Sequence, residues 1–517
     1  MLVKTEVHPP SPYQTAIYEW VKNGTGNAFV QAVAGAGKTT TLVESIKYIK
    51  KGLTVAFLAF NKDIVIELQN RLGKDFPANT LNSLGHRIIM ANMPKGVRVM
   101  LRGSKYSNLI WKALEDMGIE ANKIGNIKSV ITELLSLSMA AVTDGSDESL
   151  LDVCDHYAIS MPKDMAQTEV FNLVRNILKI GKEQAVQQGI ISFDDQIYIP
   201  VVMGWKPRNQ VDFVMVDEAQ DLSEGKLRLA MSLCKKGGRM LFVGDQNQSI
   251  YGFAGADAFA VQNIIERTNA TVLPLSISYR CPQAVIERAK EFVKDIEAAP
   301  TAPMGEFIEG IKFSDFASQV KPADMVLCRV TNPLVSACIK LLRANKAAKV
   351  IGRNVGTALV DTAKIALGSR PWDELNEALD EYMGSETLKF AKQKNGATKL
   401  QALDDKVQGV KACNDAWRNL DGSRISNIQQ FLAVIDRIFS SDEKGEGDDT
   451  KGVIKLSTVH RVKGKEAHTV WNIAPEKNFL SWVNQREWEY MQEQNIVYVL
   501  YTRAKHSFRS VLTEKAA

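Results

Sequence analysis

A glycine-rich segment near the start of the chain has the residue types and spacing of a phosphate-binding loop. Residues 32–39 read AVAGAGKT and depart from the pattern G-x-x-x-x-G-K-[ST] only at the first position, where Ala32 replaces glycine. Glycines in this pattern let backbone N–H groups face phosphate oxygens, and the helix start that follows adds partial positive charge. Lys38 can reach the β- and γ-phosphates of ATP, and Thr39 can hold Mg²⁺. The residues predicted to line the phosphates are Ala34, Gly35, Ala36, Gly37, Lys38, Thr39 and Thr40.

An acidic pair supplies the second half of this chemistry. Residues 214–221 read VMVDEAQD, so that an apolar run ends in Asp217 and Glu218. Asp217 is placed to hold Mg²⁺, and Glu218 can polarise the attacking water as general base. Two acids after a strand are often only a solvated loop, but together with the glycine-rich segment they predict an ATP-hydrolysing site.

The elements expected to position these residues alternate between strand and helix. Short apolar runs predict strands at residues 28–33, 53–60, 213–216 and 240–243. After the first of them, Leu42, Val43, Ile46 and Ile49 recur at helical spacing. Such alternation indicates a parallel sheet with helices on its faces. Further strands are expected at residues 272–275, 325–330, 453–457 and 469–473.

Two helical stretches interrupt this pattern and suggest a layout of two α/β domains, each with a mostly helical insert. The first domain is expected at residues 1–94 and 186–265, with its insert at 95–185. The second domain is expected at residues 266–369 and 451–517, with a smaller insert at 370–450 that ends in an acidic, glycine-containing linker.

Composition excludes several classes of protein. The net charge of +5 permits nucleic-acid binding without requiring it. None of the six cysteines forms a C-x-x-C pair, which argues against a zinc site, an iron–sulfur cluster or a disulfide framework. The N-terminus lacks the apolar core of a signal peptide, and no apolar run approaches the ~20 residues that span a bilayer. We therefore expect a reduced, cytoplasmic protein that does not contact membranes, and one that is nucleoid-associated if its source is bacterial or phage.

An ordered set of motifs resembles the UvrD/Rep branch of superfamily 1 helicases, with a weaker likeness to F-box DNA helicases. The resemblance covers residues 12–505 but not the inserts. The motifs, in order along the chain, are SPYQ (11–14), AFNK (59–62), TLNSLGHR (80–87), SFDD (192–195), VGDQNQSIYGFAGA (243–256), SYR (278–280), STVHRVKGKE (457–466) and VYVLYTRAK (497–505). The resemblance implies two RecA-like motor domains with ATP and Mg²⁺ between them.

The resemblance also implies a role for each matched residue of the nucleotide site. Gln14 resembles the residue that reads the adenine edge, Tyr279 the aromatic that stacks on the base, and Glu466 the carboxylate that contacts the ribose. Gln248 resembles the sensor of the γ-phosphate. Charge that grows on the transferring phosphoryl group would be neutralised by two arginine fingers, Arg280 and Arg503.

Single-stranded DNA needs a groove that offers aromatic rings, because every base has a face on which a ring can stack. The expected DNA-binding residues are Phe60, Asn61, Thr80, Asn82, Phe193, Tyr251, Phe253, Thr458 and His460. For Phe60 and Phe193 the alternative is that the ring belongs to a hydrophobic core.

Three positions depart from the family pattern. In the motif VGDQNQSIYGFAGA, Ala254 stands where the family usually has arginine. In TLNSLGHR, Asn82 stands where the family has a DNA-contacting histidine. In VYVLYTRAK, Tyr501 stands where a small or aliphatic residue is common. The second insert is also shorter than is typical of UvrD or Rep. These departures concern how the protein holds DNA and how ATP hydrolysis is coupled to DNA binding. They leave the residues of the ATP chemistry intact.

The resemblance implies an ATP-dependent helicase that moves 3′ to 5′ on single-stranded DNA and acts in repair, recombination or replication. The polarity follows from Lys463-Gly464 and from the run Ile250-Tyr251-Gly252-Phe253, which differ from the RecD/Pif1 branch. The expected partners are single-stranded and tailed duplex DNA, bound by a monomer. Three alternatives are a translocase that strips proteins from DNA with little unwinding, an RNA motor, and an ATP-switched DNA-binding adaptor. Lys38, Glu218 and Arg503 argue against the adaptor.

Overall fold

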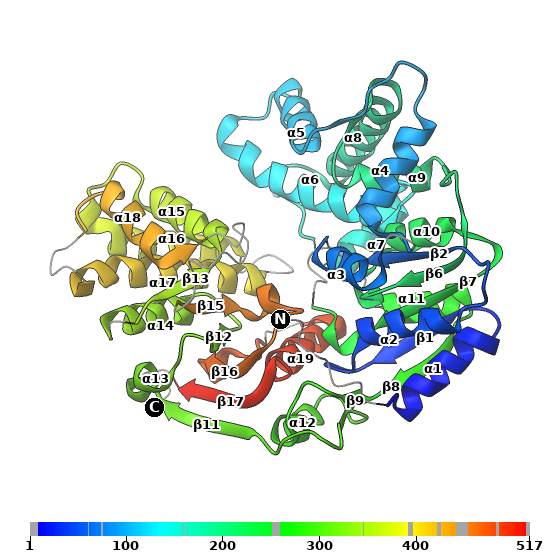
Figure 1. Ribbon diagram of the computed structural model, residues 1–517. Coiled ribbons are helices and arrows are strands. Elements are labelled where there is room, and N and C mark those ends of the chain that lie inside the picture. The colour runs from blue at the N-terminus through cyan, green and yellow to red at the C-terminus, as the bar shows by residue number, and fades with distance from the viewer. Residues whose placement is uncertain are drawn as a thin grey trace. The chain divides into compact units, whose positions relative to one another are not determined.

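The computed structural model describes residues 9–59, 62–73, 76–157, 159–162, 164–250, 259–344, 346–390, 396–420, 425–440, 453–481 and 485–512. The chain divides into two compact units, Met1–Ile277 and Ser278–Ala517. Figure 1 shows their helices and strands, coloured from blue at the N-terminus to red at the C-terminus.

The first unit is built on a six-stranded sheet in the order β3-β2-β6-β7-β1-β8. All five strand pairs are parallel, and this agrees with the alternating pattern of the sequence. Both β1 and β2 are largely buried, as expected for parallel strands covered by helices. The strands are β1 (Ala28–Ala32), β2 (Val55–Ala59), β3 (Ala78–Thr80), β6 (Val211–Val216), β7 (Cys234–Gly244) and β8 (Thr271–Leu275).

The boundary expected after residue 265 is wrong. Strand β8 pairs in parallel with β1, with Ala32 opposite Leu275, and so forms an edge of the first sheet. The Val33 amide also donates to the Leu275 carbonyl at 3.0 Å. The first unit therefore extends to Ile277, because the pairing of a distant segment completes its sheet.

Seven helices of the first unit pack with this sheet. In four of them, within residues 81–92, 195–202, 224–233 and 260–268, apolar side chains share one core with buried strand residues such as Phe29, Val214 and Phe242. The helices are α1 (Pro12–Asn23), α2 (Lys38–Ser45), α3 (Lys62–Leu72), α4 (Leu81–Asn92), α9 (Asp195–Val202), α10 (Glu224–Leu233) and α11 (Ala260–Thr268). Those that matter for the site are α2, which begins at Lys38, and α4 and α9, which flank the SFDD segment.

Four further helices of this unit lie within residues 105–188, slightly beyond the end expected at residue 185, and they supply most of the residues of a second core. They are α5 (Lys105–Asp116), α6 (Ala121–Ala141), α7 (Asp147–Tyr157) and α8 (Gln167–Gln188). The chain enters and leaves this group through two short strands, β4 (Met100–Leu101) and β5 (Ile190–Ile191), which pair in parallel. The group therefore begins and ends at neighbouring points.

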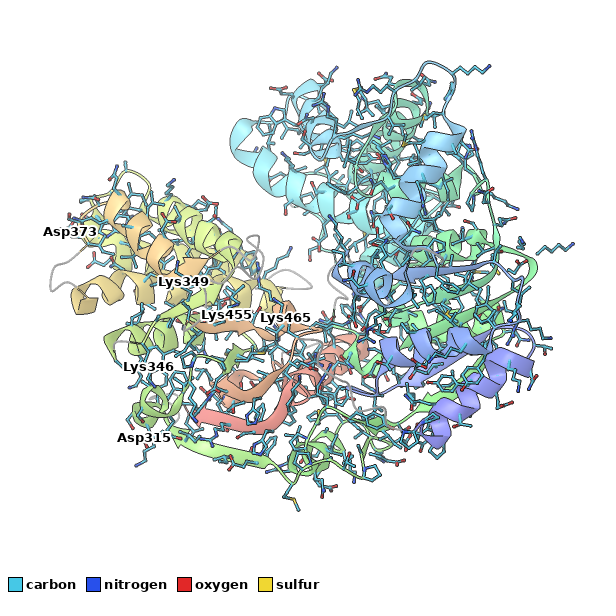
Figure 2. All side chains as sticks on the ribbon, in the orientation of Figure 1. Asp315, Lys346, Lys349, Asp373, Lys455 and Lys465 are labelled. Atoms are coloured by element: carbon cyan, nitrogen blue, oxygen red, sulfur yellow. The ribbon has the colours of Figure 1, made fainter. Side chains whose placement is uncertain are left out.

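The second unit is built on a seven-stranded sheet in the order β11-β17-β16-β12-β15-β13-β14, whose pairs are all parallel. Along β15, buried Ile454 and Leu456 flank exposed Lys455, which lies opposite Lys349 on β13 (Figure 2). The strands are β11 (Glu306–Lys312), β12 (Met325–Cys328), β13 (Ala348–Ile351), β14 (Phe439–Ser440), β15 (Ile454–Thr458), β16 (Ala467–Ile473) and β17 (Ala504–Leu512). A separate two-stranded ladder pairs β9 (Ile277–Ser278) with β10 (Glu297–Ala298).

The smaller insert expected at residues 370–450 does not form a separate body. Its Phe431 and Val410 belong to the same hydrophobic core as Val326 and Leu456 of the sheet. Its last described residues form β14, which pairs with β13 as the edge of that sheet. The helices of this unit are α12 (Gln283–Ala289), α13 (Phe313–Gln319), α14 (Asn332–Arg343), α15 (Arg353–Leu367), α16 (Leu375–Phe390), α17 (Gly396–Leu420), α18 (Ile428–Ile438) and α19 (Glu487–Tyr501).

Two further observations concern the whole described chain. The six cysteines are free thiols. None of the helices in the described ranges combines the length and apolar character that crossing a bilayer requires.

Candidate functional site

The glycine-rich segment forms a tight turn between β1 and α2. Gly35 and Gly37 adopt φ angles of 74° and 77°, a left-handed conformation that costs glycine little. Gly37 directly precedes the first residue of α2, so the turn leads into a helix N-terminus. Ala32, by contrast, is the last residue of β1 and pairs within the sheet. Its extended backbone does not require glycine, which explains why the departure at this position is tolerated.

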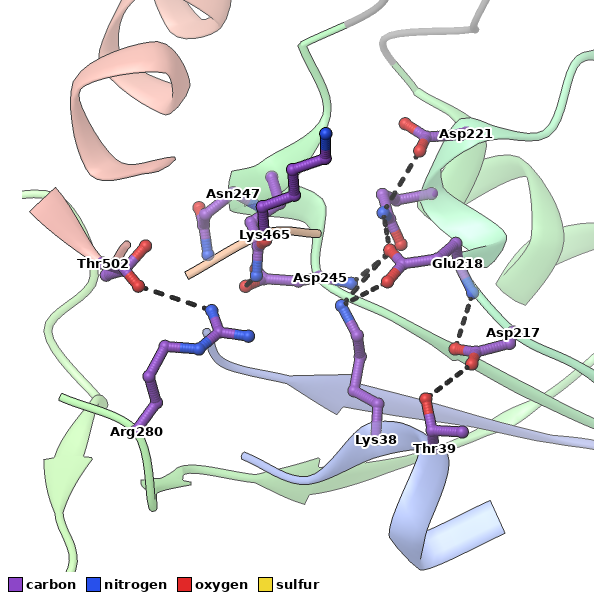
Figure 3. A network of polar contacts seen from close by, with 12 residues as sticks. Lys38, Thr39, Asp217, Glu218, Asp221, Asp245, Asn247, Arg280, Lys465 and Thr502 are labelled. Atoms are coloured by element: carbon purple, nitrogen blue, oxygen red, sulfur yellow. Dashed lines mark hydrogen bonds and ion pairs between the residues drawn. The ribbon is translucent and has the colours of Figure 1, made fainter. Parts of the chain in front are cut away.

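Lys38 points into a group of three carboxylates (Figure 3). Its ammonium lies 3.1 Å from one oxygen of Glu218 and donates to the other at 3.2 Å. Burial alone would lower the pKa of Lys38, but the negative charges of Glu218, Asp245 and Asp217 outweigh burial and raise it. Lys38 therefore stays charged, as a residue that holds phosphate oxygens must.

Thr39 and Asp217 supply the oxygen ligands that Mg²⁺ prefers. The Thr39 hydroxyl donates to the Asp217 carboxylate at 3.1 Å, and burial together with the nearby Glu218 charge raises the pKa of Asp217. A cation here would relieve that excess of negative charge, so the residues fit the ion. Among the described residues no group of three or more His, Cys, Asp or Glu side chains is arranged as a metal site.

The backbone of Glu218 is strained. This residue has φ 50° and ψ 43°, a left-handed conformation that is uncommon for residues other than glycine and that clusters at functional sites. The Gln220 amide donates to the Glu218 carboxylate at 2.5 Å, and the Gln220 side-chain oxygen accepts from the Asp245 backbone at 3.0 Å. Gln220 thus fixes the expected general base against the next strand.

Gly244 makes room for the contact between the Gln220 side chain and the Asp245 backbone. A Cβ atom at Gly244 would lie 2.7 Å from the Gln220 side-chain oxygen and 3.0 Å from its backbone nitrogen. Gly244 ends β7, and Asp245 follows it as a fully buried carboxylate. Sequence reasoning missed the roles of Gln220, Gly244 and Asp245, although all three lie within segments that it had singled out.

Gln248 joins the same network through Asp245. Its amide donates to the Asp245 carboxylate at 2.6 Å, and both side chains are buried. Burial raises the pKa of Asp245, while Lys38 and the Gln248 contact oppose that shift. The described contacts therefore form one chain of polar side chains from Lys38 through Glu218, Gln220 and Asp245 to Gln248.

Gln14 lies at the start of α1, beside the phosphate-binding helix. Its side-chain oxygen accepts from the Ser11 backbone at 2.9 Å in a capping box, and its amide donates to the Thr41 hydroxyl at 3.1 Å. This places the residue expected to read adenine against α2. Thr40 of the same helix accepts from Arg71 at 3.1 Å.

In the second unit, Arg280 and Glu466 are brought together. The Arg280 guanidinium donates to Glu466 at 2.5 Å and to the Thr502 carbonyl at 3.3 Å. Burial alone would raise the pKa of Glu466, but Lys505 and Arg280 outweigh that effect and lower it. Tyr279, the neighbour of Arg280, is 42% exposed, so its ring is accessible for stacking.

Arg503 is fully buried, and this was not expected of a residue that reaches a phosphate. Its guanidinium donates to the Val499 carbonyl at 2.9 Å and to the Lys465 carbonyl at 3.2 Å. Lys465 lies in the motif STVHRVKGKE (457–466) and Val499 in the motif VYVLYTRAK (497–505), so Arg503 ties these two motifs together.

Tyr501 belongs to an aromatic cluster, which accounts for its departure from the small residue of the family pattern. Its ring makes edge contacts with Phe307 and Phe508 at centroid distances of 5.1 and 4.9 Å, and with Phe292 at 5.9 Å. The large ring therefore fills space within the second unit.

Three expected DNA-binding residues of the first unit lie around one loop. Thr80 caps α4 by accepting from the Ser83 backbone at 3.1 Å. Asn82 donates to the Phe193 carbonyl and to Gln196, each at 3.1 Å. Phe193 is 59% exposed, so the alternative that it is a core residue is wrong. Phe60, Asn61, Tyr251 and Phe253 lie outside the described residues, as does Ala254.

We expect Phe193→Ala to weaken binding of single-stranded DNA. Removing an exposed ring that stacks on a base forfeits about 1–3 kcal/mol, or about 5- to 150-fold in the dissociation constant. Fluorescence anisotropy with a labelled oligothymidylate measures this change. Trp111→Ala, which removes another exposed ring of the same unit, serves as the control. An unchanged affinity in Phe193→Ala would remove Phe193 from the DNA site.

Thr458 and His460 lie where β15 ends and a short 3₁₀ helix, Val459–Val462, begins. Burial, with the positive charges of Arg329 and Lys463, lowers the pKa of His460 to about 3. Arg329 is itself held by Glu493 through two contacts of 3.0 and 2.7 Å. His460 is therefore neutral at physiological pH and can offer DNA a hydrogen bond but not a charge.

A phosphate-binding loop after a central parallel strand, with an acidic pair at the end of another strand of the same sheet, defines a P-loop nucleotide-binding protein. Residues 14–269 match the family model of the UvrD/REP helicase N-terminal domain, and residues 372–513 match that of the UvrD-like helicase C-terminal domain. The chain belongs to the UvrD/Rep family of superfamily 1 helicases.

Known proteins similar to the chain carry the name ATP-dependent DNA helicase PcrA. The Bacillus subtilis protein is 25% identical over 325 residues, which cover 57% of this chain and 41% of that protein. A Staphylococcus epidermidis protein is 24% identical over 298 residues, which cover 53% and 39% of the two chains. A Staphylococcus aureus protein is 24% identical over 299 residues, with 54% and 39% covered. The match thus spans about two fifths of the length of these relatives.

Proposed function

We propose that this chain is an ATP-dependent motor that moves 3′ to 5′ along single-stranded DNA and separates duplex DNA ahead of it. The observation that carries the proposal is the polar chain that runs from Lys38 to Gln248. It begins at the residue expected to hold phosphate and ends three residues before Tyr251, one of the aromatic residues expected to stack on DNA. Such a chain gives the state of the nucleotide a physical route to the DNA-binding motif.

The residues of the first unit would bind and hydrolyse ATP. The segment from Ala34 to Thr40 would cradle the phosphates, with Thr39 and Asp217 as ligands of Mg²⁺. When bound, Mg²⁺ neutralises charge on the phosphate oxygens. Glu218, released from Lys38 when phosphate takes its place, would accept the proton of the attacking water. Lys38 would then hold the transferring phosphoryl group.

The residues of the second unit would complete the nucleotide site. Tyr279 would stack on the base that Gln14 reads, and Glu466 would contact the ribose. Arg280 and Arg503 would neutralise the charge that develops on the transferring phosphoryl group. Closure on ATP and opening after hydrolysis would gate the cycle, so that conformational steps carry the movement.

On the DNA side, Phe193 would stack on a base while Asn82 holds its loop, and Thr80 and Asn82 would contact the backbone of the strand. Thr458 and neutral His460 would contact the strand from the second unit. Alternating grip by the two units would turn closure into a step. We also propose that residues 95–185 form an inserted domain, because their helices supply most of the residues of a second hydrophobic core.

We propose that the protein acts as a cytoplasmic monomer on single-stranded and tailed duplex DNA, in repair, recombination or replication. The +5 net charge suits a polyanionic track. Its relatives are named DNA helicases, which favours DNA over RNA as the track. The paired Lys38 and Glu218 suit turnover and argue against a passive adaptor.

Two assays on the whole chain test the proposal. ATP hydrolysis is measured with no nucleic acid, with single-stranded DNA and with single-stranded RNA, and strand displacement is measured on 3′-tailed, 5′-tailed and blunt duplexes. We expect stimulation by DNA and displacement only from the 3′ tail, with Lys38→Ala as the inactive control. Stimulation without displacement would indicate a protein-stripping translocase, and unstimulated turnover would exclude a DNA motor.

A further inference from the structure

A buried polar network joins the helices of residues 95–185 to the loop that carries Phe193. The Lys105 ammonium, at the start of α5, donates to the Asp195 carboxylate at 2.6 Å. The neighbouring Tyr106 hydroxyl donates to the other oxygen of Asp195 at 2.6 Å. Asp195 is the first residue of α9 and lies two residues after Phe193.

This network is closed to water and well supplied with partners. The Lys105 and Asp195 side chains are 1% and 0% exposed. Asp195 also accepts from the Ser192 backbone at 2.7 Å, while the Ser192 hydroxyl accepts from the Asp195 backbone at 3.1 Å. Charge-assisted hydrogen bonds in a dry site fix geometry closely, and a buried charge pair without such partners would be costly. The contacts therefore define the conformation of residues 192–195.

A glycine in the middle of α8 makes the network possible. The Lys105 ammonium also donates to the Gly181 carbonyl at 2.7 Å. A Cβ atom at Gly181 would lie 2.5 Å from the Tyr106 ring and 2.6 Å from its hydroxyl. Glycine within a helix costs about 1 kcal/mol relative to alanine, so the contact of Tyr106 with Asp195 is obtained at the expense of helix propensity.

Helix α4, which packs with the six-stranded sheet, also holds the loop that carries Phe193. Asn82 of α4 donates to the Phe193 carbonyl and to Gln196, each at 3.1 Å. The Phe193 ring projects from this double attachment with 59% of its surface exposed, and Asp194 beside it is exposed as well. The loop is therefore rigid at its base and presents one aromatic ring to solvent.

We propose that Lys105 and Tyr106 are positioning residues for DNA binding, and that through Asp195 they hold the Phe193 ring in the orientation that stacks on a base. This inference rests on the proposed function, since it assumes that Phe193 contacts DNA. It assigns the helices of residues 95–185 a direct part in single-strand affinity. Neither Lys105 nor Tyr106 touches DNA in this proposal.

A double-mutant cycle between Tyr106→Phe and Phe193→Ala tests the proposal on the full chain. Anisotropy with labelled oligothymidylate gives the dissociation constant of each variant. We expect Tyr106→Phe to raise this constant about three- to tenfold when Phe193 is present, and less than about twofold when it is replaced by alanine. Tyr106→Phe should also raise the DNA concentration for half-maximal ATPase stimulation more than it lowers the maximal rate.

A second pair of variants guards against a simple loss of folding. Lys105→Met combined with Asp195→Asn removes both charges at once, so no buried charge is left unpaired. This variant should also weaken DNA binding in a Phe193-dependent way, while Lys112→Met on the exposed face of α5 should not. Thermal melting of each variant establishes that it is folded.

Four results would overturn the inference. Equal loss of affinity with and without Phe193 would mean that the network acts elsewhere, and unchanged affinity in folded Tyr106→Phe would mean that it positions nothing. An unaffected Phe193→Ala variant would leave no contact to position. Wild-type protein that fails to bind single-stranded DNA would overturn the proposed function itself, and the inference with it.

Discussion

Glu218→Gln should abolish DNA-stimulated ATP hydrolysis while leaving nucleotide binding largely intact. The carboxylate lies beside Lys38 and is fixed by Gln220, so in the proposed site it would be held close to the phosphates. Glutamine keeps the shape and loses the base, which is worth about 10²- to 10⁴-fold in rate. Lys38→Ala should also abolish turnover, because it removes the charge that holds the phosphates.

Steady-state ATPase rates and the affinity for a fluorescent ATP analogue, measured on the same preparations, separate these effects. Glu44→Gln, which changes an exposed acid on α2 that pairs with Lys47, is the matched control. Normal turnover in either Glu218→Gln or Lys38→Ala would refute the assignment of the site.

Arg503→Ala should lower the maximal rate of hydrolysis strongly while changing nucleotide affinity less. An arginine that meets charge only in the transition state contributes about 10³- to 10⁵-fold in related phosphoryl-transfer enzymes. Arg503 also donates to the Val499 and Lys465 carbonyls, so its loss leaves buried acceptors unpaired. Some loss of thermal stability should therefore accompany the loss of rate.

Single-turnover kinetics and thermal melting distinguish the two effects. Arg503→Lys keeps the charge but loses the planar group that reaches both carbonyls, and Arg288→Ala removes a half-exposed arginine of the same unit. A stable Arg503→Ala variant with only a few-fold loss of rate would make Arg503 a structural residue that joins two motifs.

The sequence alone was sufficient to predict those parts of the site that are built from adjacent residues. The turn around Gly35 and Gly37, and the strand that ends just before Asp217, depend on local backbone geometry that short patterns record. Gln220 and Gly244 escaped notice because their contact depends on the pairing of β6 with β7, which brings the turn after β6 beside the end of β7. No spacing within one segment contains that information.

Long-range pairing explains the errors in the domain boundaries. Strand β8 follows a helix and precedes a new unit, and only its ladder with β1 shows to which sheet it belongs. The helices after β13 have the apolar pattern of any packed helix, and the pattern does not reveal that their partner is the sheet itself. The exposure of Phe193 was equally open in the sequence, because an aromatic residue beside two aspartates fits both a core and a surface loop.

The helices between β4 and β5 and those between β13 and β15 differ in how readily other sequences could replace them. Because β4 and β5 are paired neighbours, the chain between them could be replaced by a short connector while the six-stranded sheet keeps its strands. The segment between β13 and β15 lacks that freedom, since its apolar side chains complete the second sheet's own interior. Grafting and diversification should therefore concentrate on the helices between β4 and β5. Any replacement must cover Ile89, Tyr198 and Ile199, which share the core of these helices, and must bring a new partner for the buried carboxylate of Asp195.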